Sequence, residues 1–505
     1  MKYTYTTPIK KIILFAIAIM YFFISFTHSY TQPQGWQWAK SAGSLNGGDG
    51  GYSAIDMSGN ILMAGYFGQP SITFGFTTLL NKGAEDMFIV KYHPSGNVFW
   101  AKSYGRSGSE YANSIQTDTE GNIFVVGTFD GSIMVFDMDT LMNHSTNSAD
   151  FFLVKLNTNG IVQWAKNFGG SSDDIPINLQ LGNNGTIAVS GFFTSTAITF
   201  GNTTLTNNGY SDIFAVKFDS SGNVLWAQSA GGNQTDYGFG NCIDNDGNIY
   251  VTGDFRSTTI TFGNTILTNN GSWWDLFVVK YDANGNVLWA KSAGGTQSEG
   301  GHKVALAENG NIIVAGKLSS SSVVIGDTVL SSRGSSDILL VKYDTNGNVL
   351  WARNEGGNSH EQIADVKETS GKYILMGSFF SPTISFDNIV LSNAGGYDMF
   401  ITTFDTYGNF QNAISVGGAL RDEGGGITDA IGMVYISGSF QSPTIHFGSM
   451  TITHSDTLNP NPYTDLFLAK HSPFTEVKED DNSQFDFSLA QNYPNPFNPQ
   501  TAISF

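Results

Sequence analysis

A unit of about 62 residues repeats along the chain, and this repeat limits the possible folds more than any other feature. The string Trp-Ala-Lys-Ser or a close variant begins at Trp38, Trp100, Trp164, Trp226, Trp289 and Trp351, and degenerates at Asn412. An Asp that opens an apolar run keeps the same interval, at Asp86, Asp150, Asp212, Asp275, Asp337, Asp398 and Asp465. A Gly inside a second apolar run does the same, at Gly65, Gly127, Gly191, Gly253, Gly316, Gly377 and Gly438. The markers indicate seven units.

The fourth unit shows what one repeat contains. Four strands are expected, over residues 238–244, 249–255, 275–282 and 287–292. A small hairpin is expected over 259–268, turning at Gly263-Asn264. Asx-Gly turns between alternating apolar runs are the strongest short signal of a β-hairpin. Because no stretch keeps the 3.6-residue period of a helix, the sequence predicts an all-β fold.

The two ends of the repeat array complement each other. The strand Trp36 to Ser41 precedes the first complete unit, and the last unit has a third strand, Asp465 to Lys470, but no Trp strand after it. An open array would leave sheet edges exposed, whereas a ring leaves only short, protected ones. We therefore predict a seven-bladed β-propeller over residues 32–471, closed by pairing of these two strands.

The spacing D-x-x-G-x-x-x-W, as in Asp282, Gly285 and Trp289, puts an indole on the outer strand of each unit. A large flat side chain there can fill the wedge between neighbouring blades, so these six Trp are predicted to pack between blades. The strings W-A-K-S-x-G-G, D-x-x-G-N-I-x-V-x-G-x-F and D-x-F-V-x-K-Y-D resemble the seven-bladed propellers with SBBP-type repeats, over residues 36–471. This resemblance implies the architecture and transfers no activity.

The first 31 residues have the features of a secretory signal peptide. Lys10-Lys11 precede an apolar run from Ile12 to Phe26, which then gives way to polar residues. This run is shorter than the roughly 20 residues that a membrane-spanning helix needs. We expect no transmembrane span in the mature chain, and the alternative is an uncleaved N-terminal anchor.

The amino-acid composition changes after the last unit. Residues 472–484 are polar and charged and are expected to form a linker. The string L-x-Q-N-Y-P-N-P-F-N-P-x-T-x-I-x-F in residues 485–505 resembles the start of the C-terminal (Por) sorting domain of the type IX secretion system. That resemblance implies the type IX machinery as a partner, and a secreted or outer-membrane-associated location in a Gram-negative, Bacteroidetes-like bacterium. Such domains continue for several strands, so 485–505 is expected to be a truncated copy.

The charge balance argues against nucleic acid as a partner. Acidic residues outnumber basic ones 43 to 24, the formal net charge is −19, and no Lys/Arg cluster offsets it. The single cysteine, Cys242, excludes an intramolecular disulfide, so packing alone must stabilise the fold. We expect a monomer.

A carboxylate follows each Trp position by ten or eleven residues: Asp49, Glu110, Asp174, Asp236, Glu299, Glu361 and Asp422. Each falls in the connection between one blade and the next, around the mouth of the central channel. Two hypotheses fit: a negative ring that binds a ligand or a cation such as calcium, or carboxylates that accept backbone hydrogen bonds and lock blades together. Recurrence in every unit favours the second, because an asymmetric ligand does not need seven equivalent groups.

Aromatic residues precede the third strand in four units: Tyr210, Trp273, Trp274, Tyr397 and Tyr463. They are candidate sugar-stacking residues, although scattered surface aromatics are ordinary. No set of nucleophile, base and orienting group is evident, so no catalytic residue, enzyme activity or cofactor is predicted beyond calcium at the carboxylates. The sequence predicts an exported binding or adhesion scaffold for a glycan or protein ligand; the alternative is a hydrolase of extracellular polysaccharide or protein.

Overall fold

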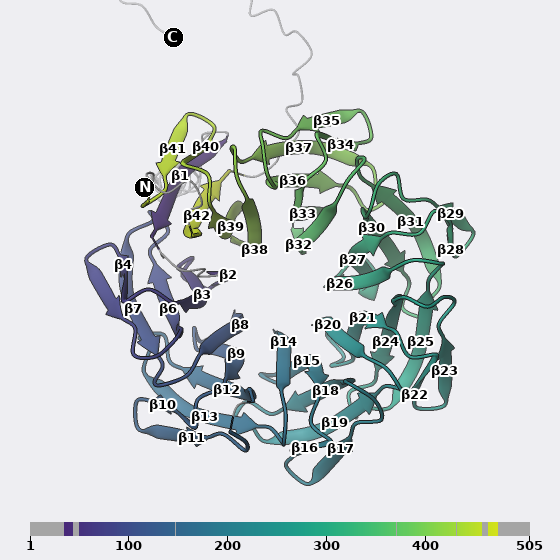
Figure 1. Cartoon of the computed structure of the whole chain (residues 1–505), viewed down its shortest axis with the longest axis horizontal. Helices are drawn as coiled ribbons and strands as arrows, with labels where there is room; N and C mark the ends of the chain where they lie inside the picture. Colours follow the sequence, from purple (N-terminus) through teal and green to yellow (C-terminus); the bar gives the residue numbers. More distant parts are fainter. Residues whose placement is uncertain are drawn as a thin grey trace, which may run out of the picture. The chain divides into compact units, whose positions relative to one another are not determined.

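The computed structural model describes residues 35–43, 50–146, 148–369, 371–430, 432–456 and 463–472. In this part of the chain, seven four-stranded sheets are arranged like blades around a central channel, each with a two-stranded hairpin (Figure 1). The prediction of an all-β, seven-bladed propeller is confirmed. The described residues contain no α-helix and one short 3-10 turn, η1 (Glu308–Gly310), and none of their helical segments could span a membrane.

Each blade runs from the channel outwards in the order first, second, third and fourth strand. The first strands are β2 (Gly50–Ile55), β8 (Glu110–Thr117), β14 (Asp174–Leu181), β20 (Asp236–Ile243), β26 (Glu299–Leu306), β32 (Glu361–Thr369) and β38 (Asp422–Ala430). The second strands are β3 (Ile61–Phe67), β9 (Ile123–Phe129), β15 (Ile187–Phe193), β21 (Ile249–Phe255), β27 (Ile312–Leu318), β33 (Lys372–Phe379) and β39 (Met433–Phe440). The third strands are β6 (Asp86–Tyr92), β12 (Asp150–Leu156), β18 (Asp212–Phe218), β24 (Asp275–Tyr281), β30 (Asp337–Tyr343), β36 (Asp398–Phe404) and β42 (Asp465–His471).

The fourth strands form the outer rim. They are β7 (Val98–Tyr104), β13 (Val162–Phe168), β19 (Val224–Ala230), β25 (Val287–Ala293), β31 (Val349–Glu355), β37 (Phe410–Val416) and β1 (Trp36–Ala42). The hairpins between second and third strands are β4 (Ser71–Phe74) with β5 (Thr77–Leu80), β10 (Ile133–Phe136) with β11 (Asp139–Met142), β16 (Ala197–Phe200) with β17 (Thr203–Thr206), β22 (Thr259–Phe262) with β23 (Thr265–Thr268), β28 (Val323–Ile325) with β29 (Thr328–Leu330), β34 (Thr383–Phe386) with β35 (Ile389–Ser392), and β40 (Thr444–Phe447) with β41 (Met450–Thr453).

The ring closes through its first strand. β1 pairs antiparallel with β42, with Trp38 opposite Lys470 and Ser41 opposite Phe467, as the sequence predicted. The two ends of the propeller are also bonded directly, because the Gly35 amide donates to Ser472 Oγ at 2.6 Å. The seventh blade is therefore built from both ends of the array.

The fourth blade shows how well element positions could be predicted. β21 and the hairpin β22–β23 have the predicted bounds. The first strand, however, begins at Asp236, two residues before the predicted start. Asp236 and Tyr237 pair with Phe255 and Asp254, so an acidic residue that suggested a turn lies inside the ladder.

The core is a series of contacts between consecutive blades. All seven residues of β21, and all seven of β24, are buried. Val251 packs with the third blade, whereas Tyr250, on the other face of the same strand, packs with the fifth. Because the middle strands are covered on both faces, apolar residues point to both sides of these strands.

The D-x-x-G-x-x-x-W spacing encodes a contact between two blades. Gly285 adopts φ +87°, and a Cβ at this position would lie 2.8 Å from Trp226 of the preceding blade. The Trp226 indole N–H donates to the carbonyl of Ala283 in the same turn, at 3.1 Å. The same contact recurs at five other junctions, where the turn glycine of the following blade lies against Trp38, Trp100, Trp164, Trp289 or Trp351. Each of the six Trp of the D-x-x-G-x-x-x-W spacing is thus held by the turn of the next blade.

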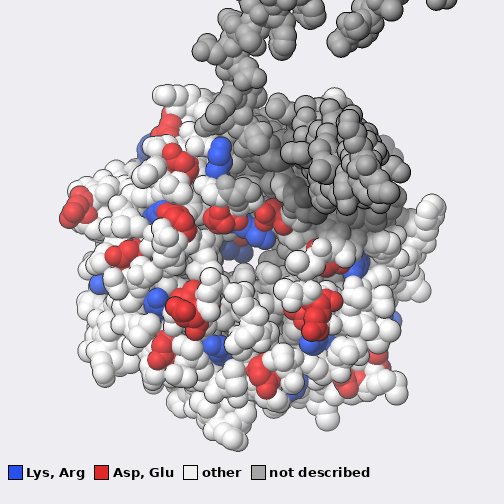
Figure 2. Space-filling model, turned by 180° about the vertical axis from the view of Figure 1, so that it is seen from behind, with Lys and Arg blue, Asp and Glu red and all other residues white. Residues whose placement is uncertain are grey.

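Charge is spread over the surface. Figure 2 shows the face opposite to that of Figure 1: acidic side chains lie around the ring with Lys and Arg among them, and both kinds lie beside the central opening. The negative net charge is therefore not gathered into one patch on the described part of this face. The predicted signal peptide (1–31), nearly all of the linker (472–484) and the sorting segment (485–505) lie outside the described residues.

Candidate ligand-binding site

Six of the seven predicted ring carboxylates are described, and Asp49 lies outside the described residues. Each of the six is the first residue of a first strand: Glu110, Asp174, Asp236, Glu299, Glu361 and Asp422. None is more than 2% exposed. They lie inside the blade junctions, under the mouth of the channel, rather than on its open rim.

Asp236 shows what these carboxylates bond to. Its Oδ1 accepts the amides of Arg256 and Ser257, both at 3.1 Å. Its Oδ2 accepts the Gly232 amide at 2.8 Å and the Ser257 hydroxyl at 2.7 Å. Glu299 and Asp422 accept from the same kinds of donor in their own blades. Each carboxylate thereby ties together two connections at the same end of its blade.

The glycine pair of the W-A-K-S-x-G-G string is required by this arrangement. A Cβ on Gly231 would lie 2.1 Å from Asp212 Oδ1, and a Cβ on Gly232 would lie 2.6 Å from the Cβ of Ser257. The first glycine, which follows the fourth strand of a blade, makes room for the third-strand Asp of that same blade. The second glycine makes room for the serine whose hydroxyl donates to the carboxylate of the next blade.

Blade two departs from this pattern in two places at once. Arg106 stands where blades three to seven have the second glycine, and Gly131 stands where those blades have the serine. Consequently Glu110 Oε1 is buried without a hydrogen-bond partner among the described residues. Burial raises the pKa of Glu110 to about 8.

The Asx-Gly turns use their carboxylates locally. Asp244 Oδ1 accepts the amides of Asp246 and Asn248, and its Oδ2 accepts the Asn248 side-chain amide at 2.8 Å. Asp282 bonds in the same way within its own turn. Within the described ranges, no group of three or more His, Cys, Asp and Glu could hold a metal ion.

The predicted sugar-stacking aromatics do not gather into one platform. Tyr210, Trp273 and Tyr463 are exposed, each on its own blade. Trp274 stacks on Tyr237, with ring centroids 5.1 Å apart and planes 14° apart. Tyr397 packs under the Arg421 guanidinium at 5.3 Å. Two of the five therefore join residues at the mouth of the channel.

The positions next to the buried carboxylates differ from blade to blade. In blades two to seven the residue after the carboxylate pairs across the ladder with the penultimate residue of the second strand. The pairs are Tyr111 with Thr128, Ile175 with Phe192, Tyr237 with Asp254, Gly300 with Lys317, Gln362 with Ser378, and Glu423 with Ser439. Blades two to four thus supply the aromatic and most apolar groups, and blades five to seven supply one cation, one amide, one carboxylate and two hydroxyls. We call these six the mouth pairs.

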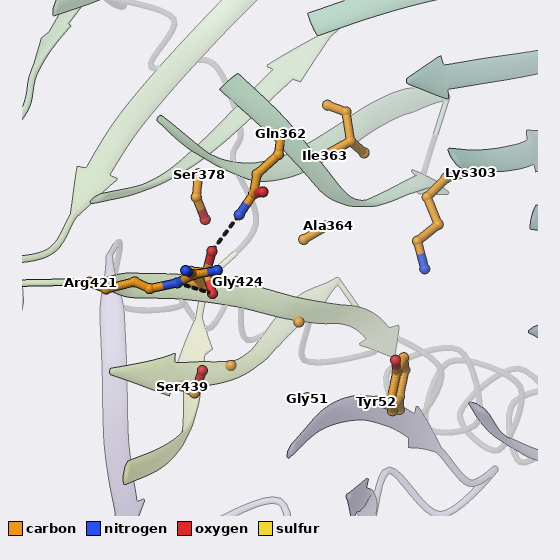
Figure 3. A pocket seen from close by; sticks show the side chains of 13 residues that line it. Gly51, Tyr52, Lys303, Gln362, Ile363, Ala364, Ser378, Arg421, Gly424 and Ser439 are labelled. Atoms are coloured by element: carbon orange, nitrogen blue, oxygen red, sulfur yellow. Dashed lines mark hydrogen bonds and ion pairs between the residues drawn. The ribbon is translucent and has the colours of Figure 1, made fainter. Parts of the chain in front are cut away.

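The mouth pairs of blades six and seven line a pocket of about 310 Å³. Gln362 Nε2 donates to Glu423 Oε1, and Arg421 Nε lies 2.8 Å from Glu423 Oε2. Figure 3 shows these groups on one side of the pocket, with Lys303 and Tyr52 on the other. Glycines line this pocket where β2 and β38 pack closely together. A Cβ on Gly51 of β2 would lie 2.8 Å from Gly425 Cα of β38.

Two further cavities adjoin this pocket. One, of about 870 Å³, lies over blades one to three and is lined by Tyr111, Thr128 and Ile175 of the mouth pairs. The other, of about 420 Å³, is the channel itself, lined by the first strands of all seven blades. Tyr52 lines all three cavities. The three cavities therefore meet at this tyrosine.

Asp254 is a buried carboxyl group among the mouth pairs. Its Oδ1 has no hydrogen-bond partner among the described residues, and burial raises its pKa to about 7 despite the charge of Lys317. The position of a Cβ on Gly300 would be 2.9 Å from Asp254 Oδ2 and 3.2 Å from His302 Nε2. Burial lowers the pKa of His302 to about 4. Perturbed groups of this kind concentrate at functional sites.

Comparison with known proteins gives the fold and no family. No family model matches the chain. It is 24% identical over 540 residues to the uncharacterised WD repeat-containing protein L264 of Acanthamoeba polyphaga mimivirus, covering 87% of this chain and 38% of that protein. It is 25% identical over 271 residues to the regulatory protein FlaEY of Caulobacter vibrioides, covering 49% and 28%. The chain spans well under half the length of both relatives.

Solved structures that resemble the chain include the endosialidase of phage phi92, with a TM-score of 0.39 at 10% identity, covering 92% of this chain and 74% of that one. A protein of unknown function from Dyadobacter fermentans gives 0.37 at 7% identity, covering 86% and 99%. The NanB sialidase of Streptococcus pneumoniae gives 0.34 at 8%, covering 82% and 69%. At these values the likeness concerns the fold alone.

The mouth pairs were not among the residues predicted from the sequence. The prediction concentrated on what recurs in every unit, and the recurring carboxylates are buried. A signal was present in the chain itself: directly after the recurring carboxylate, the residue changes from Tyr111 to Ile175, Tyr237, Gly300, Gln362 and Glu423. The position directly after the recurring carboxylate thus varies from blade to blade, whereas the carboxylate does not.

Proposed function

We propose that this protein is a non-catalytic binding propeller that holds a glycan at the channel mouth. The observation that carries the proposal is the contrast between buried carboxylates that repeat and mouth pairs that do not. Buried carboxylates with a structural role can be the same in every blade, whereas one asymmetric ligand needs different side chains on different blades. The mouth pairs supply that difference.

The chemistry of the mouth favours a hydroxyl-rich ligand. Most small-molecule pockets are lined mainly by apolar side chains with few polar groups. The pocket in Figure 3 instead presents an amide, a carboxylate, a guanidinium, two serine hydroxyls and the face of Tyr52. These groups can donate to and accept from sugar hydroxyls, and a tyrosine combines a flat apolar face with a polar edge.

Export forms part of the proposal. The features of residues 1–31, and the likeness of residues 485–505 to a type IX sorting domain, support binding outside the cell, secreted or at the cell surface. Tracing the chain by cell fractionation in a host with type IX machinery would test this. Accumulation in the cytoplasm would contradict it.

Binding can be tested on a propeller comprising residues 35–472. We expect it to bind at least one class on an array of extracellular polysaccharides without releasing reducing ends. Gln362→Ala should weaken binding about ten-fold, or about 1.4 kcal/mol. Gln163→Ala, on the outer strand β13, is the matched control and should have no effect. Failure to bind any glycan, or equal effects of the two variants, would refute the proposal, and turnover would favour the hydrolase hypothesis.

A further inference from the structure

Five blades share one serine contact. In blades three to seven, a serine just after the second strand donates its hydroxyl to the buried carboxylate that begins the first strand of the same blade. The same hydroxyl accepts the backbone amide of the residue two places before that carboxylate. In blade four, Ser257 Oγ lies 2.7 Å from Asp236 Oδ2, and the Gln234 amide donates to it at 2.9 Å. The equivalent serines are Ser195, Ser320, Ser381 and Ser442.

Blade two has no such hydroxyl, because Gly131 takes the place of the serine. Glu110 is 0% exposed, and its Oε1 has no hydrogen-bond partner among the described residues. The Gly108 amide, which corresponds to the Gln234 amide, donates to no group in the described part of the chain. A Cβ on Gly131 would lie 3.2 Å from this amide nitrogen and 3.6 Å from Glu110 Oε1. A donor and an acceptor therefore lie close to the same point, where five other blades have a hydroxyl.

This point lies at the wall of a cavity. Gly108 and Gly131 both line the cavity of about 870 Å³ over blades one to three. In blades three to seven, the position of Gly108 carries a side chain, from Ser172, Gln234, Gln297, Ser359 or Leu420. In blade two, neither position has a side chain that could close the wall in front of Glu110.

A second unsatisfied group lines the same cavity. Ser148 is 6% exposed, and its Oγ has no hydrogen-bond partner among the described residues. Buried polar groups in proteins are nearly always hydrogen-bonded, so each exception needs a partner from outside the chain or a role of its own. Ser148 and Glu110 are two such exceptions at one cavity.

We propose that the cavity over blades one to three binds a neutral sugar unit, one hydroxyl of which takes the place of the missing serine hydroxyl. This inference rests on the proposed glycan-binding function and adds the blade and the class of sugar. The ligand hydroxyl donates to Glu110 Oε1 and accepts from the Gly108 amide, as serine does in the other blades. Blades two to seven then all have a hydroxyl at this point, five from the protein and one from the ligand.

A hydroxyl fits this point better than an ammonium or a carboxylate group does. Because the Gly108 amide is a donor and Glu110 Oε1 an acceptor, the ligand group must accept one hydrogen bond and donate another. An ammonium group cannot accept, and a carboxylate cannot donate. A hydroxyl also serves Glu110 in both protonation states, since it can donate to a carboxylate or accept from a carboxyl O–H.

The charges around the cavity disfavour an acidic sugar. Its described lining includes Asp130 and Asp173 and no Lys, Arg or His, whereas the pocket in Figure 3 includes Lys303 and Arg421. Asp130 and Asp173 each accept one backbone amide through Oδ1, at 2.6 and 2.9 Å. Their second oxygens can accept from neighbouring sugar hydroxyls, and both carboxylates repel a ligand carboxylate.

Tyr111 gives the cavity a fixed flat surface. Its hydroxyl donates to Glu85 Oε2 at 2.6 Å, and its ring packs edge-to-face with that of Tyr66, with centroids 4.6 Å apart. Tyr111 and Tyr52 both line the cavity, and an aromatic ring offers a large apolar face on which the apolar face of a sugar can pack. Tyr52 also lines the pocket that contains Gln362, so one glycan chain can contact both places.

The test substitutes Gly131→Ser in the full-length chain. The new hydroxyl takes the position that we assign to the ligand hydroxyl, so the thermal midpoint should rise while the affinity for the glycan falls. The expected fall is about ten- to a hundred-fold, the factor for one hydrogen bond to a buried carboxyl group. Gln163→Ala is the control and should leave the affinity unchanged. A weaker affinity together with a higher midpoint cannot result from unfolding.

The class of sugar is tested on the wild-type chain. The probes are dextran, mannan and laminarin, which are neutral, and alginate and polygalacturonate, which carry carboxylates; carboxyl-reduced polygalacturonate is the matched control for its parent. Binding should be confined to neutral polymers. Equal binding of a carboxylated polymer would overturn the proposal. So would an unchanged affinity of Gly131→Ser for the bound glycan, because solvent rather than a ligand would then satisfy Glu110.

These outcomes are distinguishable from failure of the proposed function. If Gln362→Ala weakens binding and Gly131→Ser does not, glycan binding stands and the sugar position in blade two is wrong. If the wild type binds no glycan, both are wrong. Should Gly131→Ser fail to fold, the preference of the wild type for neutral over carboxylated polymers decides.

Discussion

Gly285→Ala tests whether the contact between a turn glycine and the Trp of the preceding blade holds neighbouring blades together. The substitution adds one methyl group at a residue with φ +87°, aimed at the Trp226 indole 2.8 Å away. The left-handed backbone alone costs an L-residue about 1–2 kcal/mol. Overpacking against a buried ring adds about 1–3 kcal/mol. We expect a total loss of about 2–5 kcal/mol.

Gly371→Ala separates these two contributions. Gly371 has φ +78°, and a Cβ there would meet nothing within 4 Å. Its substitution should therefore cost only the backbone part. The assay is urea unfolding of both variants followed by tryptophan fluorescence, with the free energy taken from the transition and its slope.

A double-mutant cycle then assigns the difference to the indole. In a Trp226→Ala background the methyl group of Gly285→Ala has room, so its cost should fall to that of Gly371→Ala. If the two glycine variants lose equal stability in the wild-type background, the indole moves aside freely. The turn glycine would then serve only its own turn, and the reasoning about blade contacts would be wrong.

Two further predictions concern the buried carboxylates. Gly131→Ser should raise the thermal midpoint, because a Cβ there would lie 3.6 Å from Glu110 Oε1, which has no hydrogen-bond partner among the described residues, so the new hydroxyl can donate to it; an unchanged or lower midpoint in thermal unfolding would contradict this. Glu299→Gln should cost about 1–3 kcal/mol, because the amide would face the Gly295, Ser319 and Ser320 donors. Calcium should raise its melting temperature no more than that of the wild type.

The sequence predicted the architecture because the fold depends on features that recur. Asx-Gly turns, apolar runs and the Trp-Ala-Lys-Ser string appear in nearly every unit, so an ambiguity in one unit is resolved by the others. The pairing of Trp36 to Ser41 with the last unit followed from counting strands. By contrast, the sequence predicts the start of β20 two residues late, because it assigns Asp236 to the connection between blades, whereas Asp236 is a buried acceptor at the start of the strand.

The candidate site could be predicted less well, for a related reason. Recurrence identified Asp174 and Asp236 correctly as special positions, but it cannot distinguish a charge at a rim from one inside a junction. That distinction depends on Ser195 and Ser257, about 21 residues further along the chain, whose hydroxyls fold back onto the carboxylates. Asp212 of the third blade and Asp236 of the fourth also interact electrostatically. Because they belong to different units, no spacing within one unit shows this interaction.

The contribution of β1 to ring closure can be isolated by moving it. Gly35 and Ser472 are in contact, since the Ser472 amide donates to the Gly35 carbonyl at 3.0 Å. A permutant that starts at Gly50 and continues from Ser472 through a copied Asp282–Asn286 turn into Trp36–Ala42 would keep every strand pair of blade seven. The ladder between β1 and β42 would, however, become an ordinary hairpin within the last blade, and no strand from the N-terminus would complete that blade.

Side-chain contacts such as that of Trp38 with Gly96 and the Pro94 carbonyl would remain at that junction. We expect the same circular dichroism spectrum as for residues 35–472, but a lower thermal midpoint. Opening the permutant breaks no backbone ladder, whereas opening the natural ring must break the pairing between β1 and β42. Equal midpoints would show that the side-chain contacts between blades are sufficient to close the ring, and that the N-terminal strand merely completes a sheet.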